Sequence, residues 1–234
     1  MLLPKLREEV LEANLELVRR GLVLYTFGNS SGISREDSLV VIKPSGVPYE
    51  TMKPADLVVT DLHGKIIEGH LRPSSDLATH IVLYKSFPKI GGVSHTHSEY
   101  ATAWAQARKS IPCLGTTHAD YFRGAIPVTD SIADSDVAGA YEENTGRAIV
   151  RLFKNINPNE MPAALVASHA PFTWGATAAE ASQNAVILET VAKLAYFAMQ
   201  IDSEAASAPG ALVDKHFLRK HGSAASYGQP KDQK

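Results

Sequence analysis

The stretch Ile-Gly-Gly-Val-Ser-His-Thr-His-Ser-Glu-Tyr-Ala-Thr-Ala-Trp-Ala-Gln, residues 90–106, decides how the rest of the chain is interpreted. Alternate residues of an extended strand point to the same face, so His95 and His97 direct two imidazoles toward one point. A cation such as zinc accepts neutral imidazole nitrogen, and a catalytic site usually has three protein ligands and one open position. The pair is equally compatible with two histidines hydrogen-bonded at a strand end. The choice depends on a third ligand elsewhere.

A third histidine follows another short apolar segment. Residues 163–168 are predicted to form a core strand that stops at His169. Three imidazoles, two on one predicted strand and one on another, are far more specific than a pair, and they predict a metal site formed by His95, His97 and His169. Solvent or ordinary hydrogen bonds are expected around the histidines that lack this context, namely His63, His70, His80 and His221.

The composition is that of an ordinary globular protein. The 234 residues are 44% hydrophobic with a formal net charge of −2, which lacks the basic surplus of a nucleic-acid-binding surface. One domain over residues 1–234 is expected, ending in a tail, 223–234, whose composition predicts disorder apart from Tyr227.

Cys113 is the only cysteine, the N-terminus is too acidic for a signal peptide, and two charges interrupt the most apolar segment, 185–199. A cytoplasmic protein without a membrane span is expected.

Apolar periodicity predicts the main helices and strands. The predicted helices cover 5–20, a segment after Asp76, 99–107, 133–144 with a second run to 153, 177–200 and 211–220. The predicted extended segments are 22–27, 39–42, a hairpin of 57–60 and 65–67, and 163–168. Residues 28–32 and 43–46 are predicted loops, which Gly, Asn, Pro and Ser fill for backbone reasons alone.

Three polar features lie outside the histidine motifs. Ser74 and Ser75 stand at a helix N-terminus, where unpaired amide groups and the helix dipole form an anion site. The adjacent Asp76 is expected to stabilise the first helical turn electrostatically. This structural role is the preferred explanation of Asp76 unless a metal lies nearby. Residues 115–122, Gly-Thr-Thr-His-Ala-Asp-Tyr-Phe, form a dense polar run that is expensive to bury without a function. Glu142 is expected near the end of the helix predicted for 133–144.

Seven motifs carry a family resemblance. They are Lys-Pro-Ser-Gly (43–46), Pro-Ser-Ser-Asp (73–76), His-Thr-His-Ser (95–98), Gly-Thr-Thr-His-Ala-Asp-Tyr-Phe (115–122), Pro-Phe-Thr-Trp-Gly (171–175), Lys-His-Phe-Leu-Arg-Lys-His-Gly (215–222) and Tyr-Gly-Gln (227–229). With nearly constant spacing from the first helix to Gln229, they resemble L-ribulose-5-phosphate 4-epimerase, a family of the class II aldolase superfamily. The resemblance implies a three-layer α/β/α fold with a largely antiparallel central sheet, assembled as a cyclic homotetramer.

The resemblance also implies roles for individual residues. It implies one zinc ion per subunit, bound by His95, His97 and His169 with Asp76 as a further ligand. The implied sugar-phosphate-binding residues are Gly28, Asn29, Ser45, Gly46, Ser74 and Ser75, with Lys43 close to the phosphate. The implied catalytic residues are Asp120 and Tyr227 as the acid/base pair, together with Glu142 and His216. Tyr227 and His216 are expected to reach the active site of a neighbouring subunit.

Some positions depart from the family pattern. Ala170 stands where the family usually has Gly, Ser226 where it has an aromatic residue, and Asp130 where Arg is common. The tail also extends five residues beyond Gln229. The zinc and acid/base positions are unaffected, so these departures bear on substrate fit and rate.

The implied reaction, interconversion of L-ribulose 5-phosphate and D-xylulose 5-phosphate, constrains the chemistry. Carbon 4 of a 2-ketose is β to the carbonyl, so its proton is not acidic, and the chain has no Gly-x-Gly-x-x-Gly nicotinamide fingerprint for oxidation and re-reduction. Retro-aldol cleavage between carbons 3 and 4 leaves an enediolate, which zinc can stabilise, and glycolaldehyde phosphate. Re-addition to the opposite aldehyde face inverts the centre and requires two acid/base groups.

Two other functions remain open at this stage. A related aldolase or dehydratase would share the zinc site, although the aldolase branch usually carries Glu where this chain has Asp76 and lacks the run ending at Phe122. A non-enzymatic metal-binding or sugar-binding module would leave Asp120 and Tyr227 unexplained.

Overall fold

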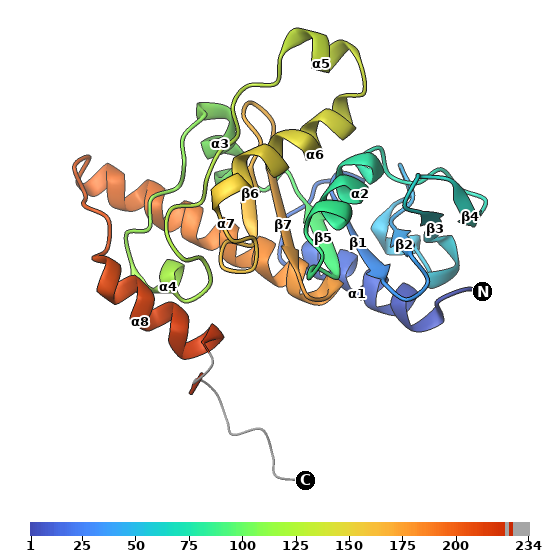
Figure 1. The fold of residues 1–234 in the computed structure, drawn as a ribbon, viewed down its shortest axis with the longest axis horizontal. Helices are drawn as coiled ribbons and strands as arrows, with labels where there is room; N and C mark the ends of the chain where they lie inside the picture. The colour runs from blue at the N-terminus through green and yellow to red at the C-terminus, as the bar shows by residue number, and fades with distance from the viewer. Residues whose placement is uncertain (223–224, 227–234) are drawn as a thin grey trace.

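The computed structural model describes residues 1–222 and 225–226 and contains one seven-stranded sheet in the order β4-β3-β2-β1-β5-β7-β6 (Figure 1). Every neighbouring pair of strands is antiparallel. The strands are β1 (Asn29–Ser34), β2 (Leu39–Ile42), β3 (Val58–Asp61), β4 (Ile66–Glu68), β5 (Gly92–His95), β6 (Ala163–Leu165) and β7 (Pro171–Gly175). The α/β class with an antiparallel central sheet is therefore confirmed.

Helices cover both faces of this sheet. They are α1 (Pro4–Arg19), α2 (Leu77–Ser86), α3 (Glu99–Ala107), α4 (Thr116–Ala119), α5 (Asp134–Ala138), α6 (Tyr141–Leu152), α7 (Ala178–Ile201) and α8 (Gly210–His221), with short 3-10 turns at Tyr49–Thr51, Pro54–Asp56 and Phe153–Asn155. Strand β2 shows how the layers form, because Val41 packs with α1 on one face while Val40 and Ile42 pack with α2 on the other. Within the described part of the chain, no helix has the length and apolar character to cross a lipid bilayer.

The first predicted loop is in fact a central strand. Residues 29–32 of that loop belong to β1, between β2 and β5, whereas the segment predicted as extended, 22–27, forms no strand. Small polar residues have low strand propensity, but Ser31 finds two partners on α2: its Oγ lies 2.7 Å from both His80 Nδ1 and Tyr84 Oη. Tertiary contacts therefore override local propensity in this strand.

The helix predicted over 133–144 is interrupted. The backbone leaves the helical region at Gly139 (φ −99°, ψ −129°), and a new helix, α6, begins at Tyr141. Glu142 consequently lies in the first turn of α6, and the prediction that it ends the preceding helix is wrong. At the start of α6, Tyr141 contacts His169.

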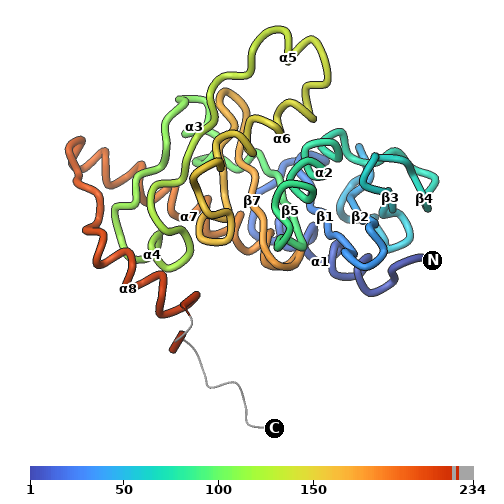
Figure 2. The backbone as a smooth tube through the Cα atoms, in the orientation of Figure 1, coloured from blue at the N-terminus to red at the C-terminus, as the bar shows by residue number. Residues whose placement is uncertain are grey.

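Two further features of the chain path matter for the site. His169 lies in the turn between β6 and β7, and His97 lies just beyond β5, so only His95 of the three is within a strand, contrary to the prediction. At the other end of the molecule from β4, α4 and α8 lie side by side (Figure 2). Their contact buries Cys113, Ala119 and Val213 together.

Candidate active site

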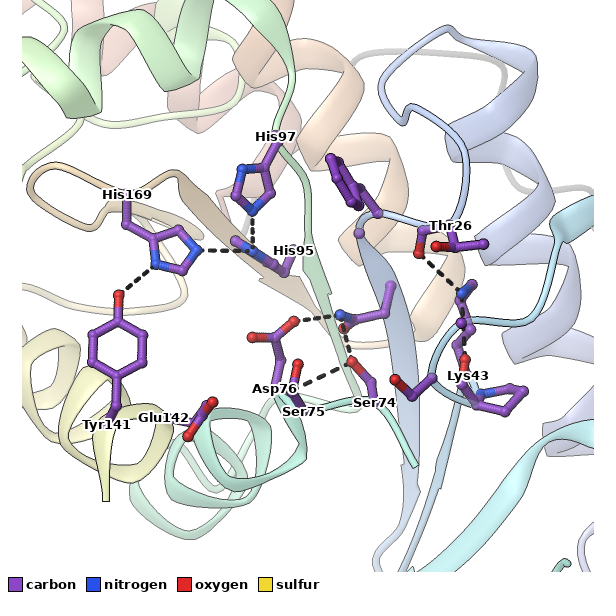
Figure 3. Close-up of a pocket in the computed structure, with 16 residues that line it drawn as sticks. Thr26, Lys43, Ser74, Ser75, Asp76, His95, His97, Tyr141, Glu142 and His169 are labelled. Carbon is purple, nitrogen blue, oxygen red and sulfur yellow. Dashed lines mark hydrogen bonds between the residues drawn. The ribbon is translucent and has the colours of Figure 1, made fainter. Parts of the chain in front are cut away.

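The three histidines predicted to bind metal converge at one end of the sheet. His95 ends β5 and pairs across the sheet with Phe172 of β7, which brings the β6–β7 turn and His169 to the same end. His95 Nε2 lies 3.1 Å from His97 Nε2 and 3.3 Å from His169 Nε2 (Figure 3). The structure thus gathers all three residues as the sequence predicts.

These residues fit a zinc-type cation. Two nitrogens bound tetrahedrally at about 2.0 to 2.1 Å from zinc lie about 3.3 Å apart. The three histidines each offer a ligand atom, and all of these atoms lie within 4.8 Å of one another. Both the donor type and the spacing therefore suit a metal with a three-histidine ligand set.

The protonation state of the imidazoles also suits metal binding. A carbonyl oxygen can only accept, so His95 Nδ1–H donates to Pro171 O at 2.9 Å, and the Nε2 lone pair faces the other rings. Burial lowers the pKa of His95 to about 3 and lowers the pKa values of His97 and His169 as well. Neutral imidazole is the form that binds a cation.

Asp76, the further ligand implied by resemblance, lies beside this group but outside it. It directly precedes α2 and lines a cavity that the three histidines also line. Its Oδ2 accepts a 2.7 Å hydrogen bond from Asn29 Nδ2. Burial by itself would raise the pKa of the Asp76 carboxyl. Nearby histidines, chiefly His95, and the Asn29 hydrogen bond outweigh burial, so the pKa lies below its usual value. Asp76 is an ionised carboxylate next to the histidines.

A cavity of about 440 Å³ extends from the histidines. It is lined by every residue expected to bind the substrate, namely Gly28, Asn29, Lys43, Ser45, Gly46, Ser74 and Ser75, and by Glu142. Main-chain hydrogen bonds join the two polar segments: Ser45 N donates to Arg72 O and Ser74 N donates to Lys43 O, both at 2.9 Å. Segments separated in sequence therefore form one wall.

Lys43 brings a buried cation to this wall. Its Nζ donates to Thr26 O at 3.2 Å and to Pro44 O at 3.3 Å, and it lies 4.6 Å from the centre of the Tyr49 ring. Burial lowers the pKa of Lys43 to about 8. The carbonyls and the ring leave the positive charge unneutralised, which suits an anionic ligand.

The structure separates Asp120 and His216 from this cavity. Asp120 follows α4, and its Oδ1 accepts from His216 Nδ1 at 3.0 Å and from Arg219 Nη2 at 2.9 Å, both on α8. Burial opposes ionisation of Asp120, but these hydrogen bonds and the neighbouring cations hold its pKa below the usual value. Neither residue lines the histidine cavity of the same chain, and Tyr227 lies outside the described residues.

The sequence interpretation gave no role to four cavity-lining residues: Thr26, Phe27, Pro44 and Tyr141. The Phe27 ring lies 6.1 Å from the His97 ring, and Tyr141 Oη lies 2.7 Å from His169 Nδ1. Burial raises the pKa of Tyr141, so it is a neutral phenol. Its position next to Glu142 was the one feature of the sequence that pointed to Tyr141. The continuous helix predicted over 133–144 did not place it at the start of a helix.

Comparison with known proteins agrees with this fold and site. A family model described as Class II Aldolase and Adducin N-terminal domain matches residues 8–196. An L-fuculose 1-phosphate aldolase is 24% identical, with 91% of this chain and 94% of that chain covered and a TM-score of 0.77. YgbL from Klebsiella pneumoniae, a candidate aldolase/epimerase/decarboxylase, is 26% identical, with 90% and 97% covered and a TM-score of 0.71.

The L-fuculose-1-phosphate aldolase from Thermus thermophilus is 21% identical, with 87% of this chain and 99% of that chain covered and a TM-score of 0.68. At this level of identity the likeness shows a shared fold. The family model, in contrast, spans the sheet, the three histidines and most of α7. The chain belongs to the class II aldolase and adducin N-terminal domain family.

Proposed function

We propose that the protein is a zinc-dependent epimerase that interconverts L-ribulose 5-phosphate and D-xylulose 5-phosphate at carbon 4. One observation carries the proposal: a single cavity joins three convergent histidines to a buried lysine and a serine-bearing helix N-terminus. A phosphorylated ketose needs both ends, one for its oxygen-bearing carbons and one for its phosphate. The motifs that resemble the epimerase family supply the identity of the sugar.

The phosphate end of the cavity is formed by main-chain and side-chain donors. Ser74 and Ser75 directly precede Asp76 and the ten-residue helix α2, whose N-terminal amides and dipole favour an anion. Lys43 supplies a positive charge on the same wall, and Ser45 supplies a hydroxyl. A phosphate dianion bound here would direct the carbon chain of the sugar toward the histidines.

The reaction end would be formed by the histidines and the acid/base groups. A zinc ion held by His95, His97 and His169 would act as a Lewis acid for the negative charge left when the bond between carbons 3 and 4 breaks. A base removes the proton of the carbon 4 hydroxyl, and carbon 4 becomes an aldehyde. The electron pair of the bond between carbons 3 and 4 passes to the dihydroxyacetone fragment. After the aldehyde turns, re-addition reforms the bond, and an acid on the other face returns the proton.

We infer that Asp120, His216 and Tyr227 serve the cavity of a neighbouring copy in a homotetramer. In support, Asp120 is ionised, as a base must be, yet it lies with His216 outside the cavity of its own chain. Catalytic groups need positioning to a fraction of an ångström, so a subunit interface would have to place them.

Co-expression of His97→Ala with Asp120→Asn tests this arrangement. In either variant alone, every active site lacks an essential residue. In randomly mixed tetramers, roughly a quarter of the sites should combine an intact His97 with an intact Asp120 from the neighbouring subunit, so roughly a quarter of wild-type activity should return. His97→Ala with His169→Ala is the matched control, because both changes damage the same end of the cavity and cannot complement. Activity at the control level in oligomers shown by native mass spectrometry to be mixed would contradict the arrangement. Tyr227→Phe in place of Asp120→Asn extends the test to the tail.

The activity itself is tested with L-ribulose 5-phosphate and zinc-loaded protein. D-xylulose 5-phosphate and free glycolaldehyde phosphate are both quantified, with His97→Ala protein as the control. Accumulation of D-xylulose 5-phosphate supports the epimerase. Free fragments without the epimer would identify an aldolase, the alternative function.

A further inference from the structure

Tyr141 contacts one of the three histidines through its hydroxyl. Its Oη lies 2.7 Å from His169 Nδ1, and the two rings are nearly parallel, with an interplanar angle of 9° and centroids 6.1 Å apart (Figure 3). The opposite nitrogen of the same ring, His169 Nε2, lies 3.3 Å from His95 Nε2. The phenol therefore holds the side of His169 that faces away from the other histidines.

The chemistry of metal binding sets the direction of this hydrogen bond. A ligating Nε2 must keep its lone pair, so the proton of neutral His169 lies on Nδ1. Nδ1–H then donates to the Tyr141 oxygen, and the phenol proton is directed away from His169. Such a partner fixes the tautomer and the ring orientation of a metal-binding histidine.

The main chain that carries Tyr141 is fixed at the contact between α2 and α6. Thr145 Oγ1 donates to Tyr141 O at 2.9 Å, and Thr79 Oγ1 of α2 donates to Glu142 O at 2.5 Å. Gly146 lets α6 approach α2 closely, since a Cβ at this position would lie 2.7 Å from Val82 Cβ. A side chain at the start of a helix held in this way is a precise support for a ligand.

His95 and His169 differ in how they are oriented. His95 donates to the main-chain oxygen of Pro171, which side-chain substitution does not remove. His169 depends on a side-chain hydroxyl from α6, 28 residues away in sequence. The hold on His169 can therefore be removed by deleting one oxygen atom.

We propose that Tyr141 is the positioning residue of His169, fixing its tautomer and ring orientation so that Nε2 faces a metal shared with His95 and His97. This proposal rests on the three-histidine metal site of the proposed function. It does not depend on which sugar phosphate is the substrate.

Tyr141→Phe is the direct test, because it removes the oxygen and keeps the ring. Zinc affinity is measured by competition with a chelating indicator, and the cobalt-substituted protein is examined by visible absorption. Zinc affinity should fall by about 10-fold to 100-fold, the usual effect of losing such a partner, and the cobalt spectrum should change. Tyr84→Phe is the matched control, since it also removes a buried phenol oxygen, whose partner is Ser31. Its zinc affinity and cobalt spectrum should match those of the wild type.

A double-mutant cycle separates positioning from a general structural effect. In His169→Ala protein, adding Tyr141→Phe should cause no further loss of zinc affinity, because the residue that it positions is gone. An unchanged affinity and spectrum in Tyr141→Phe, or an equal loss with and without His169, would overturn the assignment of Tyr141. Wild-type protein that binds neither zinc nor cobalt would instead overturn the metal site, and with it both proposals.

Discussion

Gly92→Ala would place a methyl group where β5 touches the beginning of α7. An alanine Cβ at this position would lie 2.3 Å from Thr177 O and 2.5 Å from the N and Cα atoms of Ala178. Ordinary contacts begin at 3.4 Å, so the strand and the helix would have to separate by about 1 Å. All three obstructing atoms belong to the main chain and cannot rotate away.

The expected cost follows from this geometry. Overpacking a close-packed core costs about 1 to 3 kcal/mol, and the rigid obstruction places Gly92→Ala at about 3 kcal/mol. For a chain of this size each kcal/mol lowers Tm by about 2 to 4 °C, so Tm should fall by about 6 to 12 °C. Because β5 ends at His95, the shift should also displace that ring and weaken zinc binding.

Calorimetry at matched protein and zinc concentrations measures this effect. Gly210→Ala is the control, because no atom lies within 4 Å of the Cβ that it would add, and its Tm should stay close to that of the wild type. A Gly92→Ala protein whose Tm lies within about 2 °C of the control would refute the reasoning, since strand and helix would then not be in rigid contact.

Three further predictions concern titration and charge. Burial lowers the pKa of His118 to about 4, so between about pH 4 and pH 6.5 the unfolded chain binds a proton that the folded chain does not. Stability should therefore be highest above about pH 6.5 and should fall by about 1.4 kcal/mol per pH unit as the pH decreases toward 4. Urea unfolding at several pH values measures this dependence of the unfolding free energy on pH. The dependence should be weaker in His118→Gln than in the wild type, and an equal dependence in both would contradict the burial argument. Lys43 has a pKa of about 8, so the dissociation constant of inorganic phosphate, measured by calorimetry, should rise about tenfold per pH unit well above pH 8, a dependence that Lys43→Met should abolish. Ser75→Asp should raise the Michaelis constant steeply through repulsion of the phosphate, whereas Ser75→Ala, which only removes one hydroxyl, should raise it much less. Equal constants in the two normally folded variants would place the phosphate elsewhere.

Local patterns in the sequence were sufficient for most secondary structure and for the metal ligands. The apolar periods of α1 and α7 predicted both helices to within one or two residues, because a helix that covers a sheet must repeat its apolar side chains every turn. The histidine spacing predicted a shared site because His95 and His97 lie at a strand end, a local property. Similar reasoning predicted His169 from the apolar segment 163–168, although β6 ends at Leu165 and His169 lies in the turn that follows.

Other features depended on contacts between distant parts of the chain. Residues 29–32 have the composition of a loop, yet they lie in a central strand that pairs with β2 and β5, and α2 supplies hydrogen-bond partners for Ser31. Tyr141 reached His169 because the chain breaks at Gly139 and α6 packs closely on α2.

The pairing of Asp120 with His216, 96 residues apart and outside the histidine cavity, was likewise decided by the packing of α4 on α8. The sequence by itself determined most of the helices, several of the strands and the residue types that can bind a metal, because those properties follow from near neighbours in the chain. The tertiary structure alone decided which polar groups share a cavity and which hydroxyl orients which imidazole. Such contacts depend on how closely whole elements approach one another, and no local pattern of residues specifies that distance.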